Sequence, residues 1–449
     1  MKRGTMNAER VLRGDAEKIE GGRGSVRAKG STRREGAAPS APVAGGGAHG
    51  GAPSHNSASG LTSRDPWQKV KLSEVAKGIY DGPHATPPPC DTPGYYFLGI
   101  PQITPTGHID LANPRYISED DYAKWTRRVV PREGDVIFSY EATLNLYAII
   151  PKDMRCCLGR RMGLVRPDIA KLDFRFLYYY FFSPEWRRTV VENTVTGATV
   201  DRLPIKTFPS FQMSLPPLPV QRRIADILSA YDDLIENNRR RIAILEETAR
   251  LAYRKWFGGH NISADGAVRF RHEVTKGGRG SVRAKTTTLG DVAEVLYGKD
   301  HKKIPDGAIP IFGSGGVMRY GATAIFDKPS VLIPRKGTIG NVMYVDEPFW
   351  TVDTMFYTRF KLPNMEKILY YQLCDYNLAS MSTGAAVPSM TTAILNSLEI
   401  KVPPDDLRVE FDMAVEPMFV QKRLLKKQNA ALATARDMLL PRLMKGGAA

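Results

Sequence analysis

The clearest pattern in the chain is a heptad repeat between Gln221 and Phe257, a segment without glycine or proline. Its apolar positions alternate at intervals of four and three residues, which is the 3.5-residue period of a coiled-coil seam. Charged Arg, Glu and Asp residues occupy the other faces. The seam positions that we expect to be buried are Ile224, Leu228, Tyr231, Ile235, Asn238, Ile242 and Leu245.

A second helix with a related pattern lies near the end of the chain. An offset of 187 residues carries one row of the seam onto Phe411, Met418, Leu425, Leu432 and Leu439, and the companion row onto Val415, Lys422, Asn429 and Arg436. The second row is poorer because three of its members are polar. Each helix could simply cover its own domain, but roughly 54 Å of helix at ~1.5 Å per residue is more than a small domain needs. We therefore expect the two helices to form an antiparallel coiled coil with a pseudo-two-fold axis. Asn238 would fix its register, and Asn238→Ile should stabilise the pair while loosening that register.

The same offset relates the segments ahead of the helices. TGATV at 196–200 corresponds to TGAAV at 383–387, and each is followed by an apolar strand and a double proline. Short strand patterns joined by Gly and Pro turns precede them, with helical patterns at 172–191 and 365–376. We expect an α+β fold with two domains of mixed, curved β-sheet. The predicted boundaries are 67–218 for the first domain, 219–258 for the first helix, 287–404 for the second domain, and 405–449 for the second helix and tail.

Two segments differ in composition from these domains. Residues 1–66 are rich in Gly, Ala, Pro and Ser and predict a disordered basic arm, and residues 259–286 predict a flexible linker. The string GGRGSVRAK occurs in both, at 21–29 and at 277–285. It could be a paired basic linker that touches the DNA backbone, or a duplicated insert without a role.

The net charge of +16 favours a polyanionic partner. Residues 1–66 hold 11 Lys and Arg against 6 Asp and Glu, so most of the excess belongs to the rest of the chain. A positive surface could also serve solubility alone. The charge therefore indicates nucleic acid without establishing it.

Motifs for chemistry are absent. The sequence has no GxxxxGK[ST], HExxH or GxSxG, and none of the Asn/Asp-Pro-Pro-Tyr/Phe motifs of amino-methyltransferases. The four cysteines lack metal-ligand spacing, so we expect free thiols and no metal site. We expect no cofactor in this chain. No apolar run is long enough for a membrane span, and the N-terminus lacks the apolar core of a signal peptide, which together favour the cytoplasm.

Basic and polar residues cluster in the loops of both domains. Arg335 could present its planar fork to guanine or phosphate, and the neighbouring glycines would let the backbone approach DNA. Each residue alone is more often a solvated surface group, but both domains place such residues at loop positions, which together favours DNA contacts. The candidate DNA contacts are Lys302, Lys303, Arg319, Tyr320, Arg335, Lys336, Gly337 and Thr338 in the second domain, and His84, Thr86, Tyr140, Arg160 and Arg161 in the first.

The run that begins at Pro216, PPLPVQRRIADILSAYDDLIENNRRRIAILEETARLAYRKWF, resembles the central helical region of the specificity subunits of type I restriction–modification systems. The segments SVLIPRKGTIGNVMYVDEPFWTVDTMFY and DGPHATPPP resemble their target recognition domains. The resemblance extends over roughly residues 67–445 and follows the same order of parts twice. The arm at 1–66 and the insert near 259–286 depart from the family pattern.

The resemblance implies two target recognition domains, each reading one half of a split double-stranded DNA site. It also implies two modification subunits, which bring S-adenosylmethionine and methylate adenine, and restriction subunits that bring ATP hydrolysis and Mg²⁺-dependent cleavage. This chain would itself be non-catalytic. Alternatives are a specificity chain of a methylation-only system, a self-sufficient DNA methyltransferase, and a coiled-coil assembly protein that ignores DNA.

Overall fold

The computed structural model describes residues 67–88, 90, 92–197, 200–258, 284–381 and 389–445, together with the backbone of 261–262, 268–274 and 278–283. The predicted arm at 1–66 and the TGAAV segment at 383–387 lie outside these residues. No helix in the described part of the chain is long and apolar enough to cross a membrane.

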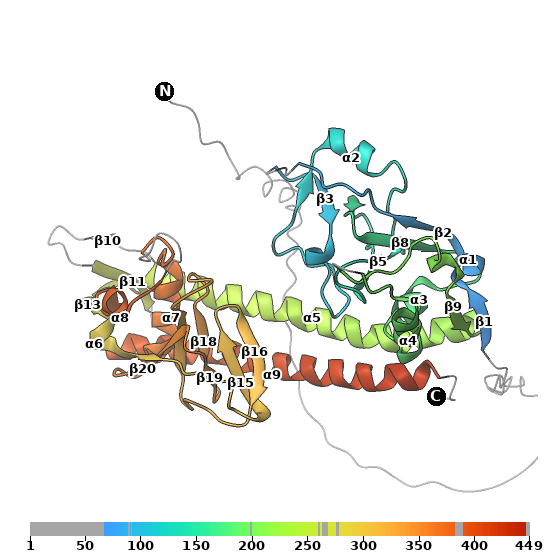
Figure 1. Cartoon of the computed structure of the whole chain (residues 1–449). Helices are drawn as coiled ribbons and strands as arrows, with labels where there is room; N and C mark the ends of the chain where they lie inside the picture. The colour runs from blue at the N-terminus through green and yellow to red at the C-terminus, as the bar shows by residue number, and fades with distance from the viewer. Residues whose placement is uncertain are drawn as a thin grey trace, which may run out of the picture. The chain divides into compact units, whose positions relative to one another are not determined.

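The first domain contains a four-stranded antiparallel sheet and a smaller mixed sheet (Figure 1). The larger sheet has the order β2 (Ala76–Asp81), β8 (Met162–Pro167), β5 (Val136–Ser139), β6 (Tyr147–Ile149). The smaller has the order β4 (Tyr116–Ile117), β3 (Tyr95–Leu98), β7 (Cys156–Leu158), with β3 parallel to β7. A separate ribbon pairs β1 (Gln68–Lys71) with β9 (Gln212–Leu215). The short helices are α1 (Leu72–Val75), η1 (Ile100–Gln102), α2 (Glu119–Trp125), α3 (Phe174–Phe181), α4 (Pro184–Asn193) and η2 (Phe208–Ser210).

The second domain repeats this plan strand for strand. Its larger sheet has the order β14 (Ala293–Tyr297), β20 (Met355–Phe360), β17 (Ser330–Pro334), β18 (Met343–Val345). Its mixed sheet has the order β16 (Gly316–Gly321), β15 (Asp306–Gly313), β19 (Trp350–Thr351), and its ribbon pairs β13 (Lys285–Thr288) with β21 (Glu399–Val402). The helices are α6 (Leu289–Val292), α7 (Glu366–Asp375) and α8 (Thr392–Asn396). The predicted α+β class and the internal repeat are confirmed.

The two long helices are α5 (Leu218–Phe257) and α9 (Asp405–Leu443), and they pack along each other. Three polar pairs between them fix an antiparallel register, because the residue numbers rise on α5 as they fall on α9. These pairs are Asp232 with Arg436, Asn238 with Asn429, and Glu246 with Lys422. The predicted antiparallel coiled coil is confirmed.

Each domain packs on its own part of the helix pair. The core of the first domain includes Ile224 and Leu228 of α5 and Leu440 of α9, whereas the core of the second includes Ala249 and Tyr253 of α5. Phe411, near the start of α9, completes the second core and lies edge-on to Tyr253. The long helices therefore contribute to two separate cores at their opposite ends.

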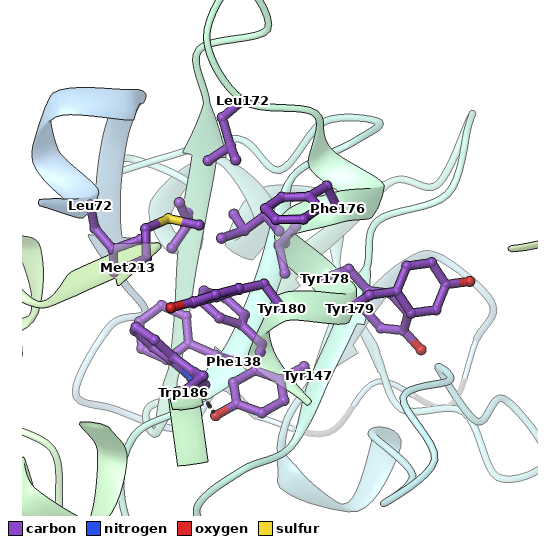
Figure 2. Close-up of a cluster of buried hydrophobic side chains, with 14 of the residues drawn as sticks. Leu72, Phe138, Tyr147, Leu172, Phe176, Tyr178, Tyr179, Tyr180, Trp186 and Met213 are labelled. Carbon is purple, nitrogen blue, oxygen red and sulfur yellow. Dashed lines mark hydrogen bonds between the residues drawn. The ribbon is translucent and has the colours of Figure 1, made fainter. Parts of the chain in front are cut away.

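The predicted aromatic helix at 172–191 forms the centre of the first core (Figure 2). It breaks at Ser183, whose hydroxyl caps the backbone N–H of Trp186, and Pro184 begins the next helix at a position where its missing N–H is harmless. The buried Trp186 indole donates to the hydroxyl of Tyr147 at 3.0 Å. This bond satisfies the polar atom of a ring that is otherwise packed among aromatic side chains.

The segment predicted as a flexible linker contains regular structure. Strands β10 (Asn261–Ile262), β11 (Val268–Val274) and β12 (Gly278–Arg283) form an antiparallel sheet, and β11 lies beside α5. Residues 278–285 of the second GGRGSVRAK string therefore run in an extended conformation through β12 into β13. Composition favoured a loop here because Gly is a weak strand former, but cross-strand backbone pairing with β11 opposes that preference.

Candidate nucleic-acid interface

The loop that follows β17 carries the principal candidate, Arg335. Its backbone N–H donates to Thr354 O at 2.9 Å, and its guanidinium Nη1 donates to Asp353 O at 3.4 Å. The guanidinium carbon lies 5.6 Å from the centre of the Tyr297 ring, within the range of a cation–π contact. Arg335 is therefore a half-buried cation held from two sides.

Gly337 is a glycine for two reasons. Its φ of +82° is in the left-handed region, and a Cβ there would come within 2.6 Å of Ser314 Oγ. Asn341 donates to Ser314 O at 2.8 Å and binds the same neighbouring turn. The loop thus packs closely on the β15–β16 turn, and the backbone around Gly337 is exposed.

A cleft of about 510 Å³ opens beside this loop. It is lined by Asp300, His301, Lys302, Gly313, Ser314, Gly315, Met318, Val352, Asp353 and Thr354. The cleft joins the loop after β14, the β15–β16 turn and the turn before β20. It brings Lys302 near Asp353 and Thr354, whose backbone carbonyls accept from Arg335.

The other candidates of the second domain divide into two groups. Lys302, Lys303, Lys336 and Thr338 are exposed, and Tyr320 is 54% exposed. Arg319 is different, because its guanidinium donates to Asp306 Oδ1 at 2.9 Å, to Ile304 O at 2.8 Å and to two acceptors of His301. Arg319 thus ties the 301–306 loop to β16 with its donors committed within the domain, and its predicted contact with DNA stays a prediction.

Hydrogen bonds identify the equivalent positions in the two domains. Gly82 N donates to Met162 O at 2.8 Å, and Gly298 N donates to Met355 O at 3.0 Å. Both glycines are required, because a Cβ would meet a backbone carbonyl oxygen at 2.2 Å in Gly82 and 2.0 Å in Gly298. A second pair of hydrogen bonds, after β5 and β17, identifies the residue of the first domain that corresponds to Arg335.

Tyr140 occupies the position of Arg335. Tyr140 O accepts from Leu203 N at 2.7 Å, as Arg335 O accepts from Met390 N at 2.9 Å. Tyr140 is nevertheless only 4% exposed, and its hydroxyl donates inward to Arg160 O at 2.7 Å. Burial raises the pKa of Tyr140 to about 12. The prediction that Tyr140 contacts DNA is therefore corrected, because its phenol belongs to the core.

The remaining candidates of the first domain lie in its surface loops. Thr86 and Arg160 are exposed, and His84 Nε2 lies 3.0 Å from Asp81 Oδ2. Arg161 Nε donates to Glu141 Oε1 at 3.1 Å and is one-third exposed. The 159–162 turn that carries both arginines is bonded to the Gly82 segment through Met162 O.

The sequence did not reveal Arg128, although the structure places it in this surface. Its Nη1 donates to Asp81 Oδ1 at 2.7 Å and to Gly82 O at 3.3 Å, and 37% of its side chain is exposed. Arg128 is one of several basic residues after α2, so its residue type alone gave no signal. Tyr297 and Asp353, which hold Arg335, were also missed, because neither their residue types nor their positions in the sequence link them to Arg335.

The predicted seam is buried along most of its length. Fully buried members are Ile224, Leu228, Ile235, Asn238, Phe411 and Leu425, and half-buried members are Tyr231, Ile242, Leu245, Met418, Leu432 and Leu439. The poorer companion row also faces the seam. Lys422 and Arg436 expose only 15% and 12% of their side chains and pair with acidic residues of α5, and burial lowers the pKa of Lys422. Polar partners across the interface thus compensate for the missing apolar residues.

Asn238 is 5% exposed and donates to Asn429 Oδ1 at 2.9 Å and to Gln428 Oε1 at 3.2 Å. Asn429 in turn donates to Ile235 O at 3.4 Å. The amide pair satisfies the buried Asn238 side chain only in the observed register. This geometry fits the register role that the sequence predicts for Asn238.

The possible metal ligands and the free thiols are dispersed over the described residues. No three His, Cys, Asp or Glu side chains among them gather closely enough to hold a metal ion. Cys156 and Cys157 are buried free thiols, and burial raises the pKa of each to about 12. The exposed polar groups of the loops are donors and acceptors suited to binding.

Two equivalent α+β domains with basic loops, joined to one antiparallel helix pair, define a duplicated recognition scaffold. The family model of the type I restriction modification DNA specificity domain matches residues 64–247 and 282–408, and the chain belongs to this family. The type I restriction enzyme MjaIX specificity subunit of Methanocaldococcus jannaschii is 23% identical over 415 residues, which cover 84% of this chain and 92% of that protein. The MjaVIII specificity subunit of the same organism is 22% identical over 206 residues, covering 44% and 43% of the two chains.

The fold has a counterpart among solved structures. The S subunit of a type I restriction–modification system from M. genitalium superposes with a TM-score of 0.50 at 17% identity. The match covers 86% of this chain and 97% of that chain. It supports the same arrangement of elements over nearly the whole described chain.

Proposed function

We propose that this chain is the non-catalytic subunit that gives a type I restriction–modification complex its DNA sequence specificity. The observation that carries the proposal is the duplication of one loop-bearing domain at the two ends of α5. Each domain would read one half of a bipartite site in double-stranded DNA. The excess of basic residues outside the arm supports a duplex partner, since phosphates release counterions when Lys and Arg neutralise them.

The helix pair sets the separation of the two readers. On α5, the last residue in the first core is Leu228 and the first in the second core is Ala249. These 21 positions correspond to about 32 Å of helix at ~1.5 Å per residue. That length is close to one turn of B-DNA, ~34 Å, which separates half-sites read from one face. A rigid spacer of this length would suit a split target with a fixed gap.

The chemistry would belong to partner subunits. Two modification subunits would bring S-adenosylmethionine and transfer methyl groups to adenine N6, and restriction subunits would bring ATP, Mg²⁺ and cleavage. The helix pair and both domains would position these enzymes relative to the bound site. Such a complex works on chromosomal and incoming DNA, so we place it in the cytoplasm.

The test is single-molecule sequencing of adenine methylation in the source strain, with and without this gene and with the gene restored. Loss of one split motif on deletion, and its return on restoration, would establish the role. An unchanged methylome would refute it as an active specificity subunit. The control strain carries Asn237→Leu, a substitution at an exposed position of α5, and should keep the motif.

A methylation-only system is the nearest alternative, and the genes beside this one separate the two. A neighbouring restriction-subunit gene, with cleavage of unmethylated target DNA, supports the full complex. A self-sufficient methyltransferase is a further alternative. Transfer of labelled methyl groups to duplex DNA by the purified chain alone would support it and overturn the non-catalytic assignment.

A further inference from the structure

The residue before the equivalent glycine holds an arginine in each domain. Asp81 precedes Gly82 and accepts from Arg128 Nη1 at 2.7 Å. Tyr297 precedes Gly298, and its ring lies under the guanidinium of Arg335 at 5.6 Å. Each arginine is thus anchored at the end of the first strand of the larger sheet, although Arg128 and Arg335 come from unrelated places in the two sequences.

Both arginines use the same nitrogen for their internal bonds. Nη1 of Arg128 donates to Asp81 and Gly82, and Nη1 of Arg335 donates to Asp353 O at 3.4 Å. Within the described residues, Nε and Nη2 of both side chains have no hydrogen-bond partner. The Nε–Nη2 edge carries two parallel N–H donors, and in both domains it remains available.

The other three arginines predicted as DNA contacts, Arg160, Arg161 and Arg319, lack this property. Arg161 commits Nε to Glu141, and Arg319 commits Nε, Nη1 and Nη2 within its own domain. Arg160 is exposed, and no side-chain bond holds it within the described residues. A guanidinium that is held in place and keeps its Nε–Nη2 edge unpaired can read a base by geometry, and Arg128 and Arg335 share this arrangement.

We propose that Arg128 and Arg335 are the matched base readers of the two domains, each placing its Nε–Nη2 edge on O6 and N7 of one guanine in the major groove. This inference rests on the proposed function. Asp81 and Tyr297 are positioning residues, which fix the guanidinium before DNA binds. The ring of Tyr297 is itself braced edge-on by buried Phe356 at 4.9 Å.

For Arg128, the local charge favours a base over a phosphate. Arg128 is paired with a carboxylate, which offsets the charge that would attract a phosphate but leaves the direction of the remaining N–H donors unchanged. The exposed Lys302, Lys303 and Lys336 are better suited to the backbone, because phosphate contacts tolerate flexible point charges. Fixed arginines would supply sequence discrimination, and the lysines would supply affinity.

The experiment uses the complex of this chain with its modification subunits and duplexes that carry the target found in the methylome. Each guanine of the target is replaced in turn by 7-deazaguanine, which lacks the N7 acceptor. We expect the wild-type complex to lose about tenfold in affinity at one guanine in each half-site, in line with the discrimination of a bidentate arginine contact. Arg335→Ala should abolish that sensitivity in one half-site, and Arg128→Ala in the other.

The matched control is Lys336→Ala, which removes an exposed charge next to Arg335. It should weaken binding to all duplexes equally and leave both 7-deazaguanine effects in place. If Arg128→Ala and Arg335→Ala behave like this control, with a lower salt dependence and unchanged base discrimination, both residues contact phosphate and the inference fails. If they change nothing, neither contacts DNA. If the wild-type complex shows no sequence preference at all, the proposed function fails instead.

The positioning role has its own readout. Tyr297→Phe keeps the ring and should keep discrimination at the Arg335 guanine, whereas Tyr297→Ala should lose it by about the same factor as Arg335→Ala. Assembly with the modification subunits, followed by size-exclusion chromatography, shows that each variant is folded. Equal loss in Tyr297→Phe and Tyr297→Ala would overturn the cation–π support, because the ring face is present in the first variant and absent in the second.

Discussion

The amide pair at the middle of the helix seam offers a test of why polar residues occur there. The offset of 187 residues maps Asn238 onto Leu425 and Asn429 onto Ile242. The observed register places Ile242 opposite Leu425, so the chain itself contains an apolar version of the Asn238–Asn429 layer. The matching substitutions are Asn238→Leu and Asn429→Ile, alone and together.

Each single substitution should destabilise the helix pair. Asn238→Leu removes the donor to Asn429 Oδ1, and leaving a partly buried amide unpaired costs about 1–2 kcal/mol. Asn429→Ile is expected to cost about 1 kcal/mol, because Asn238 keeps its bond to Gln428 Oε1. This revises the sequence-based expectation for Asn238→Ile, which took no account of a polar partner.

The double variant should be more stable than the wild type. Removing both amides leaves no unpaired group, and the buried apolar side chains together add stability of about 1 kcal/mol or more after the lost hydrogen bonds are counted. The coupling energy of the pair is then roughly 3 kcal/mol in favour of the double variant. Native-state hydrogen exchange of the α5 amides near residue 238 measures this locally and does not require the whole chain to unfold in one step.

The control for this cycle is Asn237→Leu, which makes the same chemical change on an exposed position. It should alter exchange by less than about 0.5 kcal/mol. The reasoning is refuted if Asn238→Leu alone stabilises the helix pair as much as the double substitution does. That result would mean that losing the hydrogen bond to Asn238 costs Asn429 no free energy, because water solvates the Asn238–Asn429 pair.

Three further outcomes are expected. Asp232→Ala should destabilise the chain by about 2–4 kcal/mol in thermal or denaturant unfolding, because it leaves the nearly buried Arg436 with only the exposed carboxylate of Asp437 and removes the acceptor of the Tyr179 hydroxyl; an effect below 1 kcal/mol would contradict a buried pair. Gly298→Ala should abolish recognition of one half-site in a folded complex, since its Cβ would meet Val352 O at 2.0 Å; unchanged methylation of that site would exclude a role for this close approach. Tyr140→Phe should cost about 1 kcal/mol of stability through the lost internal hydrogen bond and leave duplex affinity within about twofold, and a selective loss of sequence discrimination would restore Tyr140 as a DNA contact.

The order of the elements along the chain could be predicted from the sequence because the sequence repeats, both in heptads and between its two halves. The heptads of α5 are a local pattern that holds over its whole length, and the constant offset between Leu203 and Met390 extends through the ribbon strands into α9. The residues whose partners lie on another element were not predictable in this way. Lys422 and Arg436 interrupt the apolar row, and only the opposite helix shows that Glu246 and Asp232 satisfy them.

The candidate site was predicted less completely, for a geometric reason. The offset between equivalent positions is 216 residues at Gly82 and Gly298, 195 at Tyr140 and Arg335, and 187 at Leu203 and Met390. Loops of different length separate the shared strands, so no single offset aligns the surface. Sequence comparison correctly placed Tyr140 and Arg335 in similar loops, but burial depends on what packs around each, and only Arg335 reaches the surface.

Comparison of the two domains thus distinguishes the residues that maintain the fold from those that differ at the candidate interface. Gly82 and Gly298 keep the same residue and the same close approach to a backbone carbonyl, because any Cβ would displace the loop segment beside it. The residues immediately before them, Asp81 and Tyr297, differ in type and yet both hold an arginine. A change of residue type at these two positions can therefore alter the orientation of the bound guanidinium without disturbing the sheet. Exchanging Asp81 or Tyr297 for the residue of the other domain should therefore change base discrimination before it changes stability.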